Sequence, residues 1–129
     1  MIAVDTNVII RLLTKDDPKQ HKKSLAIFRE NIVFVSLTVL QETEWVLRFS
    51  YEFSTNDIFN ALNSLAGLEN VEIENPNILS STLELYSKGL DFSDALHLAQ
   101  CSHCEKLFTF DKKFINKAKD NKICQVEKP

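Results

Sequence analysis

The sequence predicts an α/β fold: a single domain over residues 1–129, with a central parallel β-sheet flanked by helices on both faces. Short apolar or β-branched runs alternate with longer segments whose apolar residues recur at helical spacing, a pattern typical of helix-covered parallel sheets. A chain of 129 residues fits one domain. Its 44% hydrophobic and 26% charged residues are ordinary for a globular protein in water.

Capping residues and β-branched runs define the expected elements of the first half. Pro18 suits the first turn of a helix, and Ser36 or Thr38 can cap the helix that follows the second strand. The residues at 32–35 are β-branched or aromatic, as in strands. The expected order is strand 2–4, helix 7–13, helix 18–30, strand 32–35 and a helix to about 49.

The second half continues the alternation. Ser54 opens a helix that ends near Gly67, Pro76 begins another, and Ser93 can cap the helix that starts at Asp94. The expected order is helix 54–67, strand 71–73, helix 76–89, helix 94–105, strand 107–109, helix 112–119 and strand 123–126. With only two glycines there is no G-x-G-x-x-G or Walker loop, which excludes a dinucleotide or NTP phosphate cradle.

The sequence predicts a cytoplasmic protein without a membrane segment. No basic lead-in precedes the first apolar residues, so the N-terminus does not read as a secretory signal. No apolar run approaches the roughly 20 residues of a membrane helix. Three cysteines, an odd number, indicate reduced thiols.

The net charge of −3 hides a strong asymmetry. Residues 1–41 carry six Lys/Arg against four acids, residues 42–94 two against ten, and residues 95–129 seven against four. An acidic middle with basic ends could hold a metal centrally while the C-terminal lysines Lys112, Lys113, Lys117, Lys119 and Lys122 meet phosphates. Lys112 and Lys113 follow Asp111 directly and are expected beside the pocket. The alternative is a solvated lysine-rich face formed by Lys112, Lys113, Lys117, Lys119 and Lys122.

Four acids are expected at positions where a strand is followed by a helix or loop: Asp5, Glu42, Asp94 and Asp111. Ligands of open parallel sheets bind outside the carboxyl ends of the strands. Carboxylates gathered there repel one another unless a hard divalent cation neutralises them. An all-oxygen donor set suits Mg²⁺ or Mn²⁺, one or two ions, and indicates metal-assisted phosphodiester hydrolysis.

Short polar residues near these acids are expected to orient them. Thr6, Asn7 and Thr109 can hold a carboxylate or a water. Asp94 is expected in the first turn of its helix, where the dipole favours an anion. Asp91 either extends the acidic pocket or caps this helix.

The ordered motifs resemble those of PIN-domain nucleases, and within that family the toxin ribonucleases of VapBC-type toxin–antitoxin modules. The resemblance covers the whole chain. Its motifs are Ile-Ala-Val-Asp-Thr-Asn at 2–7, Glu42 after the second strand, Asp-Phe-Ser-Asp-Ala-Leu-His at 91–97 and Phe-Thr-Phe-Asp at 108–111.

The resemblance implies a four-carboxylate pocket in which metal-activated water cleaves RNA. Asp5 and Asp94 would be direct ligands of Mg²⁺ or Mn²⁺, and Glu42 and Asp111 would act directly or through water. It also implies a homodimer and inhibition by a small antitoxin, a DNA-binding protein encoded nearby.

The helix after the second strand has more apolar residues than one buried face needs. Leu37, Leu40 and Leu47 supply an inward stripe. A neighbouring stripe is expected to line an antitoxin groove with Tyr51, Phe53 and Phe59, unless the next helix covers it. The residues of this groove stripe are Val39, Trp45, Val46 and Phe49.

Three other interpretations remain open at this point. Cys101 and Cys104 form a C-x-x-C that, with His97 and Cys124, could bind zinc or act in redox chemistry, although small buried thiols are the simpler interpretation. Asp5 could be the nucleophile of a haloacid-dehalogenase-like phosphatase, but Asn7 replaces the general acid. A receiver-like binding module lacks the phosphoacceptor Asp after strand 71–73.

Overall fold

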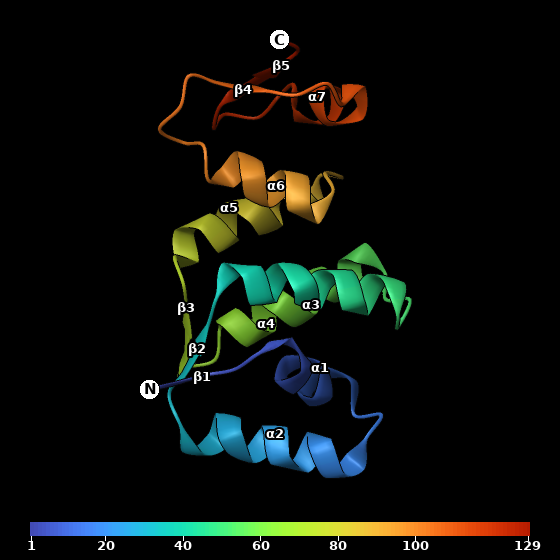
Figure 1. Ribbon diagram of the computed structural model, residues 1–129, viewed down its shortest axis with the longest axis vertical. Coiled ribbons are helices and arrows are strands. Elements are labelled where there is room, and N and C mark those ends of the chain that lie inside the picture. Colours follow the sequence, from blue (N-terminus) through green and yellow to red (C-terminus); the bar gives the residue numbers. More distant parts are fainter. The chain divides into compact units, whose positions relative to one another are not determined.

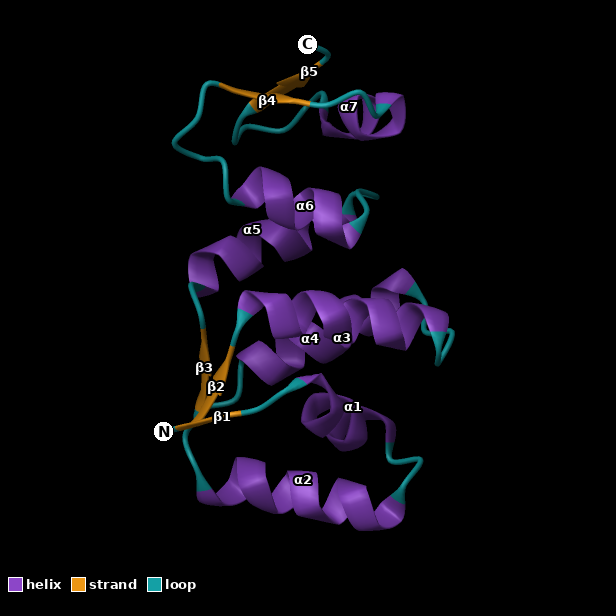
Figure 2. Ribbon diagram, viewed as in Figure 1, coloured by secondary structure: helices purple, strands orange, loops and turns teal.

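Short parallel strands alternate with helices along the chain, which confirms the predicted α/β class (Figures 1 and 2). The computed structural model describes residues 1–129. Contacts divide the chain into an N-terminal unit, Met1–Pro76, and a C-terminal unit, Asn77–Pro129. The single domain over the whole chain stays a prediction. None of the seven helices has the length and hydropathy needed to cross a membrane.

The N-terminal unit contains a three-stranded parallel sheet in the order β1-β2-β3. Its elements are β1 (Ile2–Ala3), α1 (Thr6–Thr14), α2 (Pro18–Glu30), β2 (Val33–Val35), α3 (Leu37–Phe49), α4 (Thr55–Ala66) and β3 (Val71–Ile73). Val33 pairs with Ile2 on one side and Val71 on the other. Two helices connect each pair of consecutive strands, as parallel pairing requires a crossover.

Side-chain caps set the helix starts in this unit, largely as the sequence predicts. Asp17 accepts the Gln20 backbone N–H at 3.0 Å, so α2 begins at Pro18. Ser36, rather than Thr38, caps α3 by accepting the Val39 N–H at 3.2 Å. Ser54 caps α4 through the Asp57 N–H at 3.1 Å. Each cap satisfies a backbone donor that the first helical turn leaves unpaired.

The inward stripe of α3 is buried as predicted. Leu37, Leu40 and Leu47 are all buried, and Ile58 and Leu62 of α4 are fully buried as well. Figure 1 shows α1, α2, α3 and α4 on one side of the three strands. Helices on the second face of this sheet therefore stay a prediction. The buried stripe fixes which residues of α3 face outward, and these include Glu42.

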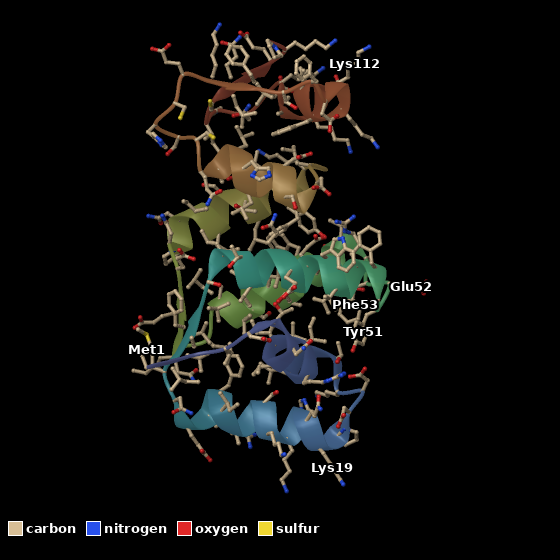
Figure 3. The ribbon with its side chains drawn as sticks, in the orientation of Figure 1. Met1, Lys19, Tyr51, Glu52, Phe53 and Lys112 are labelled. Atoms are coloured by element: carbon tan, nitrogen blue, oxygen red, sulfur yellow. The ribbon has the colours of Figure 1, made fainter.

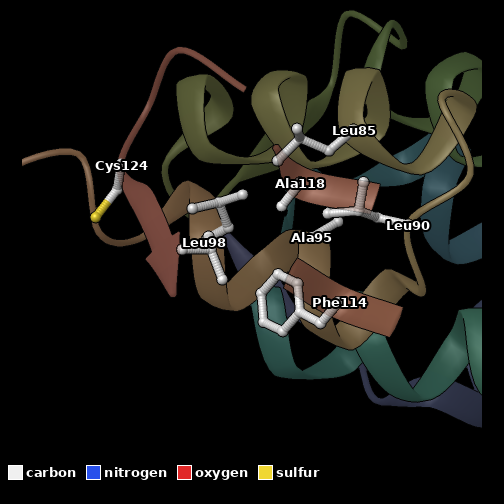
Figure 4. Close-up of a cluster of buried hydrophobic side chains, with 8 residues drawn as sticks. Leu85, Leu90, Ala95, Leu98, Phe114, Ala118 and Cys124 are labelled. Atoms are coloured by element: carbon white, nitrogen blue, oxygen red, sulfur yellow. The ribbon is translucent and has the colours of Figure 1, made fainter. Parts of the chain in front are cut away.

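The C-terminal unit has a two-stranded parallel sheet, β4 paired with β5. Its elements are α5 (Pro76–Ser87), α6 (Phe92–Ala99), β4 (Lys106–Phe108), α7 (Lys112–Ala118) and β5 (Gln125–Glu127). The core of the unit joins α5, α6, α7 and β5 (Figure 4). Its buried residues are Leu85, Leu90, Ala95, Leu98, Phe114, Ala118, Cys124 and Val126.

The predicted limits of α6 are wrong at both ends. The Asp91 carboxylate accepts the backbone N–H groups of Ser93 and Asp94, which confirms the cap expected at Asp91 and excludes Ser93 as the cap. It ends at Ala99, well before residue 105, because the chain then folds into tight turns. In these turns the Cys101 N–H donates to the Leu98 carbonyl at 3.0 Å.

Candidate functional site

Asp5 lies between β1 and α1 and caps the helix. Its Oδ1 accepts the Asn7 backbone N–H at 2.9 Å, and its side chain is exposed. The cap uses one carboxylate oxygen, which holds the side chain at the N-terminal end of α1, where the helix dipole favours a negative charge. For Asn7, the contact is through the backbone amide.

Glu42 lies in the second turn of α3 and is also exposed. The Thr6 hydroxyl donates a hydrogen bond to Glu42 Oε1. Thr6 is buried and is the first residue of α1, so this bond ties the start of α1 to α3 across 36 positions of sequence. The N-terminal unit thus brings Asp5 and Glu42 into one neighbourhood through the residue that follows Asp5.

Asp94 lies in the first turn of α6 and is half-buried. Burial raises the pKa of its carboxyl above the usual range, and the negative charges of Asp91 and then Asp111 raise it further, while His97 opposes them. The two neighbouring acids act in the same direction because a like charge disfavours ionisation. The C-terminal unit therefore gathers Asp91, Asp94 and Asp111 into one acidic group.

Asp111 begins α7 as Asp91 begins α6. Its Oδ1 accepts the backbone N–H groups of Lys113 at 2.9 Å and Phe114 at 3.2 Å. Its own N–H donates to the Thr109 hydroxyl oxygen at 3.1 Å. Thr109 therefore orients the backbone at Asp111 rather than its carboxylate.

The donor chemistry of these acids fits a hard divalent cation. Every candidate side chain offers carboxylate oxygens, which Mg²⁺ and Mn²⁺ prefer. Burial is the main cause of the raised pKa of Asp94, and the negative charges of Asp91 and Asp111 add to it against the opposing effect of His97. Within each unit, no three His, Cys, Asp or Glu side chains converge closely enough to hold an ion. The zinc interpretation of the cysteines loses its support for the same reason.

The lysines predicted to meet RNA stand at the start of α7. Lys112 and Lys113 are exposed and follow Asp111 directly. Lys112 lines a hollow of about 480 Å³ together with Lys119 and Lys128. Lys119 was among the lysines predicted to meet phosphates, and it is two helical turns from Lys112, so the two share a face. Lys128 was not predicted.

Two other lysines of this unit already have protein partners. Lys117 donates to the Gly89 carbonyl at 2.9 Å, and Lys106 pairs with Glu127 at 2.7 Å. These contacts leave Lys112, Lys119 and Lys128 as the basic group that faces one open hollow.

The groove stripe of α3 is only partly covered. Trp45 is 55% exposed and Phe49 58% exposed, whereas Val39 and Val46 are half-buried. The Trp45 and Phe49 rings contact each other with centroids 5.1 Å apart. The adjoining helix, α4, therefore does not cover the two aromatic rings.

Tyr51 and Phe53 follow α3 in the segment labelled in Figure 3. Their rings meet edge to face, with centroids 6.4 Å apart. The Tyr51 hydroxyl donates to Asp16 Oδ2 at 2.7 Å. This bond links the segment after α3 to the loop after α1, a contact that the sequence did not indicate.

Glu44 is a buried acid that the sequence analysis missed. Its side chain is 2% exposed, and Arg48 contacts both of its carboxylate oxygens, at 2.8 and 3.2 Å. Arg48 also lies over the Phe49 ring, 4.5 Å from its centroid. The i, i+4 spacing of Glu44 and Arg48 was a visible signal of this pair, but their burial was not.

Comparison with known families matches residues 2–120 to the PIN domain. The chain belongs to the PIN domain family. PIN domains are generally metal-dependent nucleases, typically with divalent ions, so the chain has a nuclease fold. Comparison with curated proteins finds none that matches. The family favours the nuclease interpretation over the phosphatase and receiver alternatives, and the match includes the acids of both units.

Proposed function

We propose that this PIN domain protein is the toxin endoribonuclease of a type II toxin–antitoxin module. The observation that carries the proposal is the acidic group at Asp94, inside a family match that also includes Asp5 and Glu42. An acid such as Asp94, whose pKa is raised by burial and by neighbouring acids, is typical of functional sites. An acid with a purely structural role would instead have a cation or a hydrogen-bond donor nearby, which would stabilise its charged form.

Asp5 and Asp94 are the proposed direct ligands of Mg²⁺ or Mn²⁺, with Glu42 and Asp111 acting directly or through water. The ion, when bound, supplies the Lewis acidity that activates the attacking water and offsets charge on the leaving oxygen. The protein's own contribution is orientation: Thr6 holds the Glu42 carboxylate, and the caps at Asp5 and Asp111 fix those side chains. Asp91 fixes the first turn of α6, which carries Asp94.

The RNA backbone is the proposed ligand of the lysines at α7. Lys112 and Lys113 lie beside Asp111, and Lys119 and Lys128 extend the positive charge along the hollow that Lys112 lines. Lysines bind phosphates as point charges without reading sequence, so this surface would position RNA rather than select it.

A small DNA-binding antitoxin and a second copy of the chain are the proposed protein partners. The exposed rings of Trp45 and Phe49 support an antitoxin surface, because aromatic residues are enriched at interfaces. Glu42 lies one helical turn from both Val39 and Val46 of the groove stripe, so a bound antitoxin would lie next to a candidate acid. If Trp45→Ala and Phe49→Ala leave the affinity of an adjacently encoded small protein unchanged, the antitoxin surface lies elsewhere.

The proposed activity is tested with purified protein and a structured RNA, in Mg²⁺, in Mn²⁺ and in EDTA. We expect cleavage only with an ion, and no cleavage of DNA of the same sequence. Asp94→Asn should lower the rate by about three orders of magnitude, because it removes a ligand while nearly preserving shape. The matched control is Asp57→Asn, which changes an exposed acid in the first turn of α4. Full activity in EDTA, or undiminished cleavage by Asp94→Asn, would contradict the proposal.

A further inference from the structure

The three cysteines of the chain all lie in the C-terminal unit, and the proposed nuclease uses none of them. Cys101 and Cys104 follow α6, and Cys124 immediately precedes β5. All three are free thiols. Cys104 is exposed, Cys101 is half-buried and Cys124 is buried at one side of the core cluster (Figure 4).

The backbone brings Cys101 and Cys104 together in one tight turn. The Cys104 N–H donates to the Cys101 carbonyl at 2.9 Å. This bond makes the two cysteines the first and fourth residues of a turn, whose end Cα atoms lie within about 7 Å of each other. Disulfides span Cα separations of about 4.4–6.8 Å, so the turn suits a bond between them.

The side chains are neighbours as well. Burial raises the pKa of the Cys101 thiol, and the nearby sulfurs of Cys104 and Cys124 raise it further, with a hydrogen bond to Cys104. The Cys101 thiol donates to the His97 carbonyl at 3.1 Å. Cys104 and Cys124 line one hollow of about 500 Å³, so solvent and small solutes reach this region.

A metal does not account for the cluster. No three His, Cys, Asp or Glu side chains converge closely enough to hold an ion, even though His97 and His103 are close to the cysteines in sequence. Simple burial of small thiols does not account for it either, because Cys104 is exposed. What remains is a pair of thiols in a turn that fits a disulfide, with one member open to solvent.

We propose that Cys101 and Cys104 form an oxidisable dithiol that closes to an intramolecular disulfide with a hydroperoxide as oxidant. The inference does not depend on the proposed nuclease activity. It assigns a modification site to the C-x-x-C motif, with Cys124 outside the pair.

The oxidation proceeds in two balanced steps. The Cys104 thiolate attacks a peroxide oxygen, the O–O bond breaks, and the departing alkoxide or hydroxide takes a proton, which leaves a sulfenic acid on Cys104. The Cys101 thiolate then attacks the Cys104 sulfur, the S–O bond breaks, and water is released. Two thiols and one hydroperoxide thus give one disulfide, one alcohol or water, and one water.

Exposure and burial assign the order of the two cysteines. The thiolate is the reactive form, and the raised pKa of Cys101 makes that form scarce there. Cys104 is exposed and is the thiol that a solute meets first. Cys101 then needs only to reach across one turn, so the second step is intramolecular. The disulfide would close at the C-terminal end of α6, opposite Asp91 and Asp94.

Peptide mapping of the whole wild-type protein tests the pairing. Reduced protein is treated with hydrogen peroxide, denatured in acid, alkylated with N-ethylmaleimide and cut with trypsin. Cleavage after Lys88 and Lys106 puts Cys101 and Cys104 in one peptide, 89–106, while Cys124 falls in 123–129. We expect peptide 89–106 to lose two hydrogen atoms and escape alkylation, so that free thiols fall from three to one.

Single serine variants test the order and supply the control. Cys124→Ser should form the same disulfide as wild type. Cys101→Ser should stop at a sulfenic acid on Cys104 that dimedone traps, and Cys104→Ser should consume peroxide more slowly than Cys101→Ser. A cross-link between peptides 89–106 and 123–129, a disulfide between two chains, or full alkylation of all three thiols in the wild-type protein would overturn the proposal.

Discussion

Asp16 in the N-terminal unit and Asp94 in the C-terminal unit start from the same ordinary pKa of 3.8 and are shifted in opposite directions. Asp16 accepts hydrogen bonds from Tyr51 and Thr14 and pairs with Arg11 at 2.9 Å. Its pKa falls to about 2, chiefly through the Tyr51 hydroxyl. Burial raises the pKa of Asp94 instead, and the charges of Asp91 and Asp111 raise it further.

The difference separates a structural acid from a candidate functional one. Donors and a cation around Asp16 stabilise its charged form in the folded state, so the fold itself explains why the acid is there. At Asp94 only His97 favours the charged form, and burial, Asp91 and Asp111 outweigh it, so the charge of Asp94 costs stability at neutral pH. An unfavourable charge of this kind is common at functional sites, and it supports the proposal that Asp94 binds a cation.

Glu44 is a buried acid of the N-terminal unit with an arginine partner, and removing this partner should have the largest effect on stability. Arg48→Ala would leave a carboxylate that is 2% exposed without its guanidinium. We expect a loss of about 2–3 kcal/mol in the free energy of unfolding, less than for a fully buried pair because Arg48 is partly exposed. Urea unfolding measures it. Arg29→Ala, at an exposed site in the last turn of α2, should change stability by no more than about 0.5 kcal/mol, and an equal loss there would refute the special role of the pair.

The lysines beside the acidic group should affect RNA binding without changing the chemistry. Replacing Lys112 and Lys113 with Gln removes two proposed phosphate contacts. For single-stranded RNA this should make the slope of log K against log salt concentration shallower by about 1.4. KM should rise while kcat changes less. The matched control is Lys22→Gln with Lys23→Gln, which neutralises two adjacent exposed lysines on α2. An unchanged salt slope would identify Lys112 and Lys113 as a solvated face.

Acid should weaken the N-terminal unit through Asp16. Because its folded pKa is lowered, Asp16 contributes stability that is fully present above its unfolded value of 3.8 and is lost as pH falls toward about 2. Tyr51→Phe removes the largest cause of the lowered pKa of Asp16. The folded pKa should then lie nearer 3.8, so that less stability is lost and the loss spans a narrower pH range. Unfolding curves between pH 2 and 5 measure the effect. Asp57→Asn should keep the wild-type profile in this range, and an identical profile for Asp16→Asn would contradict the assignment.

Local signals in the sequence predicted most elements, since caps and turns depend on neighbouring residues. Asp17 followed by Pro18 gave the start of α2, and Ser36 was one of two residues expected to begin α3. The start of α6 was missed because Asp91 and Ser93 are both good caps, and only the folded chain shows which carboxylate or hydroxyl meets the free N–H groups.

The site was predictable as a set of residue types but not as a set of contacts. The acids Asp5, Glu42 and Asp111 could be seen in the sequence to follow strands, but the expected strand before Asp94 is wrong, because α6 follows α5 directly. The bond from Thr6 to Glu42 spans 36 positions and the bond from Tyr51 to Asp16 spans 35, so no local pattern indicates them. The burial of Glu44 could not be predicted for the same reason. Its partner Arg48, four residues on, can be seen in the sequence, but the residues that cover Glu44 cannot.

We propose that Asp5 and Asp94 are both needed for one metal-dependent reaction. Thermal melts with Mn²⁺ and with EDTA test it most directly, on wild type, Asp5→Asn, Asp94→Asn and the double variant, with Asp57→Asn as control. In EDTA, Asp94→Asn should be at least as stable as wild type, because it removes the charge that Asp91 and Asp111 oppose. Each single variant should lose most of the Mn²⁺-dependent rise in Tm, and the double variant should lose no more, because one ion needs both ligands. A full rise in either single variant, or losses that add in the double variant as for two separate sites, would contradict the claim.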